Sequence, residues 1–158
     1  MVRGARPAPG APEVRLVYAE RHVRRRRLRT ATGEEFLLDL AEPTELKDGD
    51  ALRLDDGGAV QVRAAPEPLA EARAEGSALA RLAWHVGNRH TPCQIDGDRL
   101  LIQRDHVLED MLRRLGAEVR HVEAPFQPEG GAYGHGRTHG HAHAPHAHDD
   151  PNAHLRHD

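Results

Sequence analysis

Cysteine and aromatic residues are scarce in this sequence of 158 residues. Cys93 is the only cysteine, which excludes a disulfide bond within the chain and favours a reducing compartment. Aromatic residues make up 3 %, so hydrophobic cores have to be built from aliphatic side chains. No apolar run approaches the roughly 18 residues that a membrane-spanning helix needs, and the N-terminus lacks a secretory signal. We therefore expect a cytoplasmic protein that does not bind membranes.

Several functional motifs are also missing. The glycine-rich phosphate-binding loop of nucleotide hydrolases does not occur, so we expect no nucleotide chemistry. Charge is nearly balanced, with 22 Lys and Arg against 25 Asp and Glu, which argues against a nucleic-acid binder. Cys93 and His90 would be the candidate pair for covalent catalysis, but no loop for an oxyanion hole accompanies them. We therefore expect a protein that is not an enzyme.

Histidine, in contrast, is abundant, with 13 residues in the chain. It recurs through residues 135–158, between Gly, Ala, Pro, Asp and Asn. This segment is too polar to bury a core, so we expect it to be a disordered tail. Imidazole suits zinc, copper and nickel, and a flexible chain can bring several imidazoles to one ion. We therefore predict metal binding by the tail, with His135, His139, His141 and His143 as candidate ligands, and a merely pH-responsive tail as the alternative.

Short strand-like runs separated by turn signals occupy residues 13–65. The acidic, glycine-rich stretch 55–58 is typical of a turn, and the flanking runs Ala51–Leu54 and Ala59–Arg63 have the pattern of a hairpin. We expect a small N-terminal β domain over residues 13–65. The preceding residues 1–12 are rich in Pro, Gly and Ala and are expected to be disordered.

Four consecutive arginines, Arg24–Arg27, form the strongest charge run of the chain. We interpret them as outward positions of a strand, balanced by Glu34, Glu35 and Asp39 across a hairpin. The alternative is a docking surface for a protein partner. A nucleic-acid patch is disfavoured because no aromatic side chains lie nearby and the whole chain is acidic.

Residues 66–134 follow a β-α-β-β-α-β pattern. The expected elements are a strand at 69–74, a helix at 77–87, strands at 93–96 and 99–103, a helix after Asp105 and a strand at 118–122. Ser77 and Asp105 are the expected N-caps, and Gly116 is the expected stop of the second helix. This order predicts an α+β, ferredoxin-like domain, in which two helices cover one face of a four-stranded antiparallel sheet.

The most informative stretch is Trp84–Ile95, where the first helix of this domain must end. Gly87-Asn88 stops the helix and Pro92 enforces an extended exit, so His90 is expected on an ordered corner. We interpret His90 as a metal ligand, with a histidine that caps the helix carbonyls as the alternative. One imidazole cannot hold an ion, so either Cys93 or, better, a second copy of His90 across a twofold axis would complete the site.

The remaining histidines are less informative. His106, at the first turn of the second helix, is as much a candidate metal ligand as a residue without a role in metal binding. His85 is interpreted as a favourable positive charge at a helix C-terminus. His121 and His22 are expected to be solvated.

Three motifs and the tail resemble a known family. They are Gly87-Asn88-Arg89-His90-Thr91-Pro92-Cys93-Gln94-Ile95, then Asp105-His106-Val107-Leu108-Glu109-Asp110-Met111-Leu112, then Pro125-Phe126-Gln127-Pro128-Glu129-Gly130-Gly131-Ala132-Tyr133, and the His-rich end. Together they are similar to UreE, the family of urease accessory nickel metallochaperones. The resemblance is clear over residues 66–158 and weaker upstream.

The resemblance implies a homodimer in which His90 of both subunits meets at one interfacial nickel site that tail histidines complete. It also implies an N-terminal domain that engages partner proteins. The function implied is delivery of Ni²⁺ to apo-urease together with the GTPase UreG and the other urease accessory proteins. Zn²⁺ or Cu²⁺ would compete in vitro. General storage or detoxification of nickel, zinc or copper is the alternative function.

Two positions depart from the family pattern. Some relatives carry His-x-His where Arg104 and His106 stand here, so an auxiliary metal site would be incomplete. Cys93 occupies a position that is often apolar in relatives, which favours packing as a small hydrophobic residue.

Overall fold

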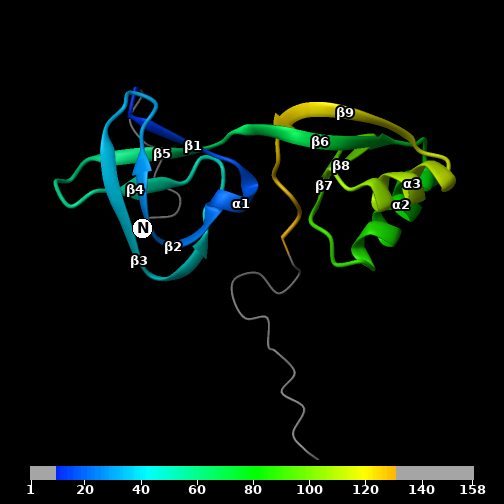
Figure 1. The fold of residues 1–158 in the computed structure, drawn as a ribbon, viewed down its shortest axis with the longest axis horizontal. Coiled ribbons are helices and arrows are strands. Elements are labelled where there is room, and N and C mark those ends of the chain that lie inside the picture. The colour runs from blue at the N-terminus through cyan, green and yellow to red at the C-terminus, as the bar shows by residue number, and fades with distance from the viewer. Residues whose placement is uncertain (1–9, 131–158) are drawn as a thin grey trace, which may run out of the picture.

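Residues 10–130 are described by the structure, which is a computed structural model (Figure 1). These residues form an α+β fold, as the sequence predicts, and contain three helices and three separate sheets. None of the helices in this range has the length and apolar character to cross a lipid bilayer. Most of the expected disordered N-terminal segment and the whole of the expected His-rich tail lie outside the described residues.

The first half of the described chain forms two small sheets around one aliphatic core. Its elements are β1 (Glu13–Leu16), α1 (Tyr18–Arg21), β2 (His22–Arg29), β3 (Glu35–Glu45), β4 (Ala51–Arg53) and β5 (Ala59–Ala64). β4 and β5 form the predicted hairpin, β2 and β3 form a second antiparallel pair, and β1 pairs with β5 in parallel. Side chains from both sheets, among them Val14, Leu38 and Val60, share one core cluster. The predicted β-rich character is confirmed, but α1 and the parallel pair were not predicted.

The arginine run lies on β2, where two of its four side chains pair with carboxylates. Arg25 faces Asp39 of β3 across the hairpin, with 3.6 Å between Nε and Oδ2. Arg26 donates to Glu20 of α1 at 2.7 Å, from Nη2 to Oε1. The interpretation as an outward-facing strand is confirmed, because all four arginines are exposed. Of the three predicted carboxylates, however, only Asp39 pairs with the run, and the second partner is Glu20 of α1.

The second half forms the predicted ferredoxin-like arrangement. Its elements are β6 (Pro66–Arg73), α2 (Ser77–Gly87), β7 (Cys93–Asp96), β8 (Arg99–Gln103), α3 (His106–Arg114) and β9 (Glu118–Pro125). The four strands pair antiparallel in the order β7-β8-β6-β9. α2 and α3 lie on the same side of this sheet (Figure 1). Their apolar residues, including Leu82, Val86 and Leu112, pack on Ala70 and Ile102 of the sheet.

The ends of α2 and α3 lie where the sequence predicts them, except for the N-cap of α2. The Asp105 carboxylate accepts hydrogen bonds from the amides of Val107 and Leu108, both at 2.9 Å, and so caps α3 as predicted. Gly116 takes a φ of +94° just past the end of α3, which fits the predicted stop. The prediction that Ser77 is the N-cap of α2 was wrong. Gly76 occupies the cap position with a φ of +54°, so Ser77 becomes the first helical residue.

The sheet face opposite the helices carries a buried carboxylate surrounded by arginines. Glu71 on β6 is only 3 % exposed, and it accepts from Arg73 Nε at 2.8 Å and Arg99 Nη1 at 2.6 Å. Arg120 Nε lies 3.4 Å from the same carboxylate. The hydrogen bond from Arg73, helped by Arg99 and opposed by burial, holds the pKa of Glu71 below its ordinary value. Glu71 therefore links three strands of the sheet as a charged group.

α1 packs against one end of this same face, which lies opposite α2 and α3. Leu69 of β6, Leu101 of β8 and Phe126 form a small buried cluster that the Tyr18 ring contacts edge-on, with 5.3 Å between the Tyr18 and Phe126 ring centres. The Tyr18 amide donates to the buried Glu67 carboxylate at 2.7 Å. These contacts join the N-terminal half to the ferredoxin-like sheet.

We expect Glu71→Gln to lower the free energy of unfolding by about 1–2 kcal/mol at pH 7, because the arginines lose a charged acceptor. Since the pKa of Glu71 is depressed in the folded protein, its contribution is present above the ordinary value of 4.5 and is lost as pH falls through the lower folded value. Urea denaturation of wild type and variant at pH 7 and pH 3 measures both effects. The difference should shrink at pH 3, and the exposed Glu75→Gln should change little at either pH. An equal difference at both pH values would contradict the assignment.

Candidate metal centre

α2 ends in a sharp turn that isolates His90. The amides of Asn88, Arg89 and His90 donate to the carbonyls of Trp84, Val86 and Gly87 at 2.9–3.0 Å. His90 then takes a φ of +53°, and no other non-glycine residue in the described part of the chain has a positive φ. This left-handed conformation costs a non-glycine residue roughly 1–2 kcal/mol. A strained backbone of this kind is typical of residues that are held for a function.

The His90 side chain does not cap the helix. The Arg89 guanidinium donates to the His85 carbonyl at 3.0 Å, and backbone amides satisfy the other carbonyls of the last turn. The His90 side chain is exposed, and its imidazole has no hydrogen-bond partner among residues 10–130. The capping alternative is therefore wrong, and the imidazole is available to a ligand.

A surface hollow of about 400 Å³ lies along α3, beside Arg89. Its lining residues are Arg89, His106, Val107, Asp110, Met111, Arg114 and Leu115. Two large apolar side chains are exposed in this part of the fold, Trp84 on α2 at 64 % and Val107 on α3 at 61 %. The structure thus brings His106 to the same hollow as Arg89, the neighbour of His90.

The described residues do not contain a complete metal site. No three His, Cys, Asp or Glu side chains between residues 10 and 130 are arranged so that they could hold an ion. The predicted ligands His135, His139, His141 and His143 lie outside the described residues. His90 and His106 remain the two predicted ligands whose positions are known.

Cys93 behaves as a core residue. Its half-buried side chain packs against the cluster between the sheet and the two helices. Burial, together with the nearby Glu129 carboxylate, raises the pKa of the Cys93 thiol to about 11. A thiol with this pKa is protonated at neutral pH, which disfavours a nucleophile and fits a small hydrophobic residue.

After β9 the chain crosses the sheet face that lies opposite α2 and α3. It reaches the other edge of the sheet, at β7. We call residues 126–129 the return segment. The Gln127 amide donates to Gln94 Oε1 at 2.7 Å, and the Glu129 amide donates to the Cys93 carbonyl at 2.8 Å. Both acceptors belong to β7, an edge strand of the sheet, and the segment runs down beside β7 in Figure 1. The described chain therefore ends close to Cys93, three residues from His90. The sequence analysis missed this path, for which the only signal was the isolated apolar Phe126.

His121 is not simply solvated as predicted. Its Nε2 lies 2.8 Å from Oε2 of Glu109, a residue of α3 that is only 5 % exposed. Burial tends to raise the pKa of Glu109, but hydrogen bonds from His121 and Arg113 outweigh it and hold that pKa below its ordinary value. The pair joins β9 to α3, and no third ligand accompanies it within the described range, so its role is structural.

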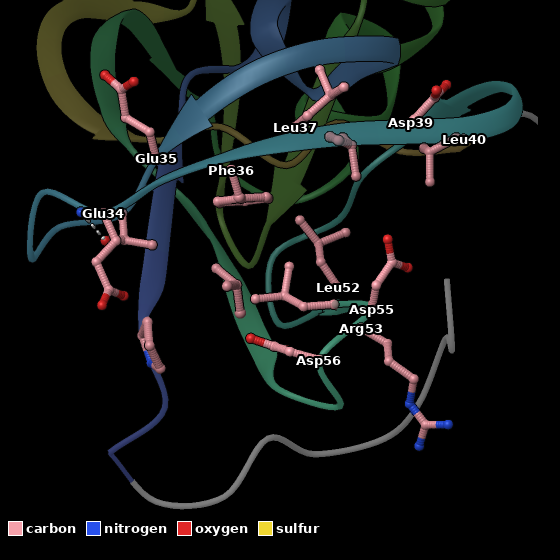
Figure 2. Close-up of a pocket in the computed structure, with 15 residues that line it drawn as sticks. Glu34, Glu35, Phe36, Leu37, Asp39, Leu40, Leu52, Arg53, Asp55 and Asp56 are labelled. Carbon is pink, nitrogen blue, oxygen red and sulfur yellow. Dashed lines mark hydrogen bonds between the residues drawn. The ribbon is translucent and has the colours of Figure 1, made fainter.

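A second hollow, which the sequence analysis also missed, lies in the N-terminal half. It has a volume of about 890 Å³ and lies between β3 and the β4–β5 hairpin, and we call it the β3–β4 groove (Figure 2). Phe36 and Leu52 point into it, whereas Leu37 points away. Its lining contains five carboxylates and one arginine: Glu34, Glu35, Asp39, Asp55, Asp56 and Arg53. Glu35 and Asp39 point away from the groove, as Leu37 does, and pair with Arg29 and Arg25 of β2. The groove therefore combines an apolar floor with an acidic rim formed by Glu34, Asp55 and Asp56.

Comparison with known proteins identifies the family. The N-terminal domain of the UreE urease accessory protein matches residues 3–65, and the C-terminal domain of the same protein matches residues 67–157. The chain belongs to the UreE family of urease accessory proteins. The UreE of Ruegeria pomeroyi is 59 % identical over 82 % of this chain and 86 % of its own length. The UreE of Paracoccus denitrificans is 59 % identical over 87 % and 86 %, and that of Cereibacter sphaeroides is 57 % identical over 90 % and 77 %.

The UreE assignment confirms the resemblance carried by the three sequence motifs. UreE proteins are named as accessory proteins of urease and not as enzymes, which is consistent with a role in urease maturation. The two UreE matches meet at residues 65–67, where β6 begins.

We expect the Cys93 thiol to react with iodoacetamide at pH 8 at least about tenfold more slowly than a free cysteine, because little thiolate is present. Mass spectrometry of the labelled protein over time gives the rate. The same protein unfolded in guanidinium should react at the rate of free cysteine. A rate in the folded protein equal to that of free cysteine would show a reactive thiol and would restore Cys93 as a candidate ligand or nucleophile.

Proposed function

We propose that this UreE protein binds Ni²⁺ as cargo and delivers it to apo-urease in the cytoplasm. The observation that carries the proposal is the exposed His90 imidazole, which has no hydrogen-bond partner among the described residues and stands on a strained, left-handed backbone. Such a group is pre-positioned for an external ligand. Membership of a urease accessory family makes nickel the relevant ion, since nickel is the metal of urease.

In this proposal the ion binds on the twofold axis of a homodimer. A second copy would cover the exposed Trp84 and Val107 side chains and the hollow beside Arg89. Two His90 imidazoles then supply two nitrogen ligands, and His106 lies at the rim as a further candidate. Residues 66–134 act as the metal-binding domain.

Tail histidines complete the coordination. The Glu129 amide is bonded to the Cys93 carbonyl, and three residues separate Cys93 from His90, a span of at most roughly 11 Å. Six residues separate Glu129 from His135 and can extend over roughly 20 Å. His135 can therefore reach His90, and so can His139, His141 and His143. Residues 135–158 would collect the ion, and the paired His90 residues would hold it.

The intrinsic affinity of imidazole ligands does not by itself make the proposed site specific for nickel. Imidazole sites bind copper and often zinc more tightly than nickel, so Zn²⁺ or Cu²⁺ would compete in vitro. Selective delivery then depends on the partners, which we propose to be the urease apoprotein and its accessory proteins, especially the GTPase UreG. The alternative, general storage of nickel, zinc or copper, requires no such partner.

The β3–β4 groove supports docking of a partner by the N-terminal half, over residues 13–65. β3 and β4 are each paired on one side only, so an extended segment could add to a free strand edge. The rim carboxylates Glu34, Asp55 and Asp56 favour a segment rich in Lys or Arg, and the apolar floor favours alternating aliphatic residues.

We expect His90→Ala to remove the tightest nickel-binding phase, with at least tenfold weaker affinity, because both interfacial imidazoles are lost. Isothermal titration with Ni²⁺ measures the phases, and analytical ultracentrifugation checks that the dimer persists. Truncation after Tyr133 should lower the number of ions per dimer. His22→Ala, an exposed histidine on β2, serves as the control. An unchanged tight phase in His90→Ala would contradict the proposed site.

Deletion of the gene distinguishes delivery of nickel to urease from general metal storage. Deleting the gene should leave urease with little nickel at limiting external Ni²⁺, and the wild-type gene should restore it. If urease purified from the deletion strain contains its full nickel content, the storage alternative is favoured and delivery is contradicted.

We expect Asp55→Lys in the β3–β4 groove to weaken capture of nucleotide-loaded UreG several-fold while leaving the nickel titration unchanged, because it reverses charge on the rim alone. Surface plasmon resonance with immobilised UreG measures the affinity. Glu75→Lys, an equal charge change before α2, is the matched control. Equal affinities for wild type and Asp55→Lys would exclude the groove as the docking site.

A further inference from the structure

We propose that Gln94 is a positioning residue for metal capture, because its side chain holds the return segment on β7 and thereby starts the His-rich tail beside His90. This inference rests on the proposed function, in which His90 and tail histidines share one nickel ion. It adds a role for residues that do not touch the metal.

Two hydrogen bonds join the return segment to the edge of the sheet. Gln94 Oε1 accepts from the Gln127 amide at 2.7 Å, and the Cys93 carbonyl accepts from the Glu129 amide at 2.8 Å. The acceptor of the first bond is the Gln94 side chain, so a substitution of Gln94 can remove that bond. The Glu129 carboxylate also contributes to the raised pKa of Cys93, which agrees with close contact between the segment and β7.

The other end of the return segment is held separately. Phe126 is fully buried against Leu69 and Leu101, and the guanidinium of Arg21, only 2 % exposed, donates to the Phe126 carbonyl. Loss of the bonds to β7 would therefore leave Phe126 as the last fixed residue of the chain. That residue lies over β6 and β8, one to two strand spacings, or roughly 5–10 Å, from β7.

The consequence for the metal site is a change in effective concentration. Releasing the segment would add three residues, 127–129, to the span between the last attached residue, Phe126, and the tail histidines, and would place the start of that span farther from His90. The local concentration of tail histidines at His90 then falls, because a longer chain samples a larger volume. We expect a two- to fivefold loss of nickel affinity, without any change in the ligands themselves.

Matched variants separate the hydrogen bonds from other effects. Gln94→Leu removes the side-chain acceptor, whereas Gln94→Glu keeps an acceptor of the same shape. Glu129→Pro removes the amide donor, whereas Glu129→Ala removes only the carboxylate. Each disruptive variant thus has a partner that preserves the hydrogen bond.

Amide hydrogen exchange of the metal-free full chain, followed by NMR, tests the attachment itself. The Gln127 amide should be protected in wild type, Gln94→Glu and Glu129→Ala. It should exchange at least fivefold faster in Gln94→Leu and Glu129→Pro. An unprotected Gln127 amide in the wild type, or equal rates in Gln94→Leu and Gln94→Glu, would overturn the proposal without reference to nickel.

Nickel titration tests the consequence. Gln94→Leu and Glu129→Pro should weaken the tight phase two- to fivefold in the full chain and should have no effect in a chain truncated after Tyr133. The same loss in the truncated chain would indicate merely structural damage and would overturn the positioning role. Equal nickel affinity of Gln94→Leu and Gln94→Glu, in a protein whose His90→Ala variant has lost the tight phase, would overturn this inference alone. Retention of the tight phase in His90→Ala would instead contradict the proposed function.

Discussion

The left-handed turn at His90 is the constraint on which the rest of this structure depends. It ends α2 abruptly, exposes the imidazole and starts the extended chain that becomes β7. The packing of α2 on the sheet, through Leu82 and Val86, keeps this turn in one place. Stability in the helix and sheet core thus offsets the backbone strain at the residue that the proposed function needs.

The sheet face opposite α2 and α3 connects the His90 corner with the N-terminal half. Phe126 lies on this face, in contact with Tyr18 and bonded to Arg21 of α1, and the return segment continues from it to β7. A single stretch of four residues therefore touches the N-terminal half, the sheet and the strand that follows His90. This arrangement gives the proposed cargo site and the proposed partner site a common structural support.

The sequence predicted the parts of the fold that depend on local periodicity. The two helices and four strands of the second half were predicted because their apolar residues recur at helical or strand spacing, and Asp105 caps α3 as its position implied. Ser77 was misassigned because Gly76 takes the cap conformation with no side chain to signal it. Long-range contacts left no local signal: Gln94 and Gln127 are 33 positions apart, and His121 reaches a carboxylate that is 12 positions away. The ordered corner at His90 was predicted because a helix stop, a histidine and a proline lie within six residues.

A crystal structure of the nickel-loaded full-length protein, with the ion located by anomalous scattering at the nickel edge, tests the central claim most directly. The account predicts one strong peak on a twofold axis, bonded to the His90 imidazole of each protomer. Nickel bound only by tail histidines, with the two His90 rings on separate surfaces of the assembly, would contradict it.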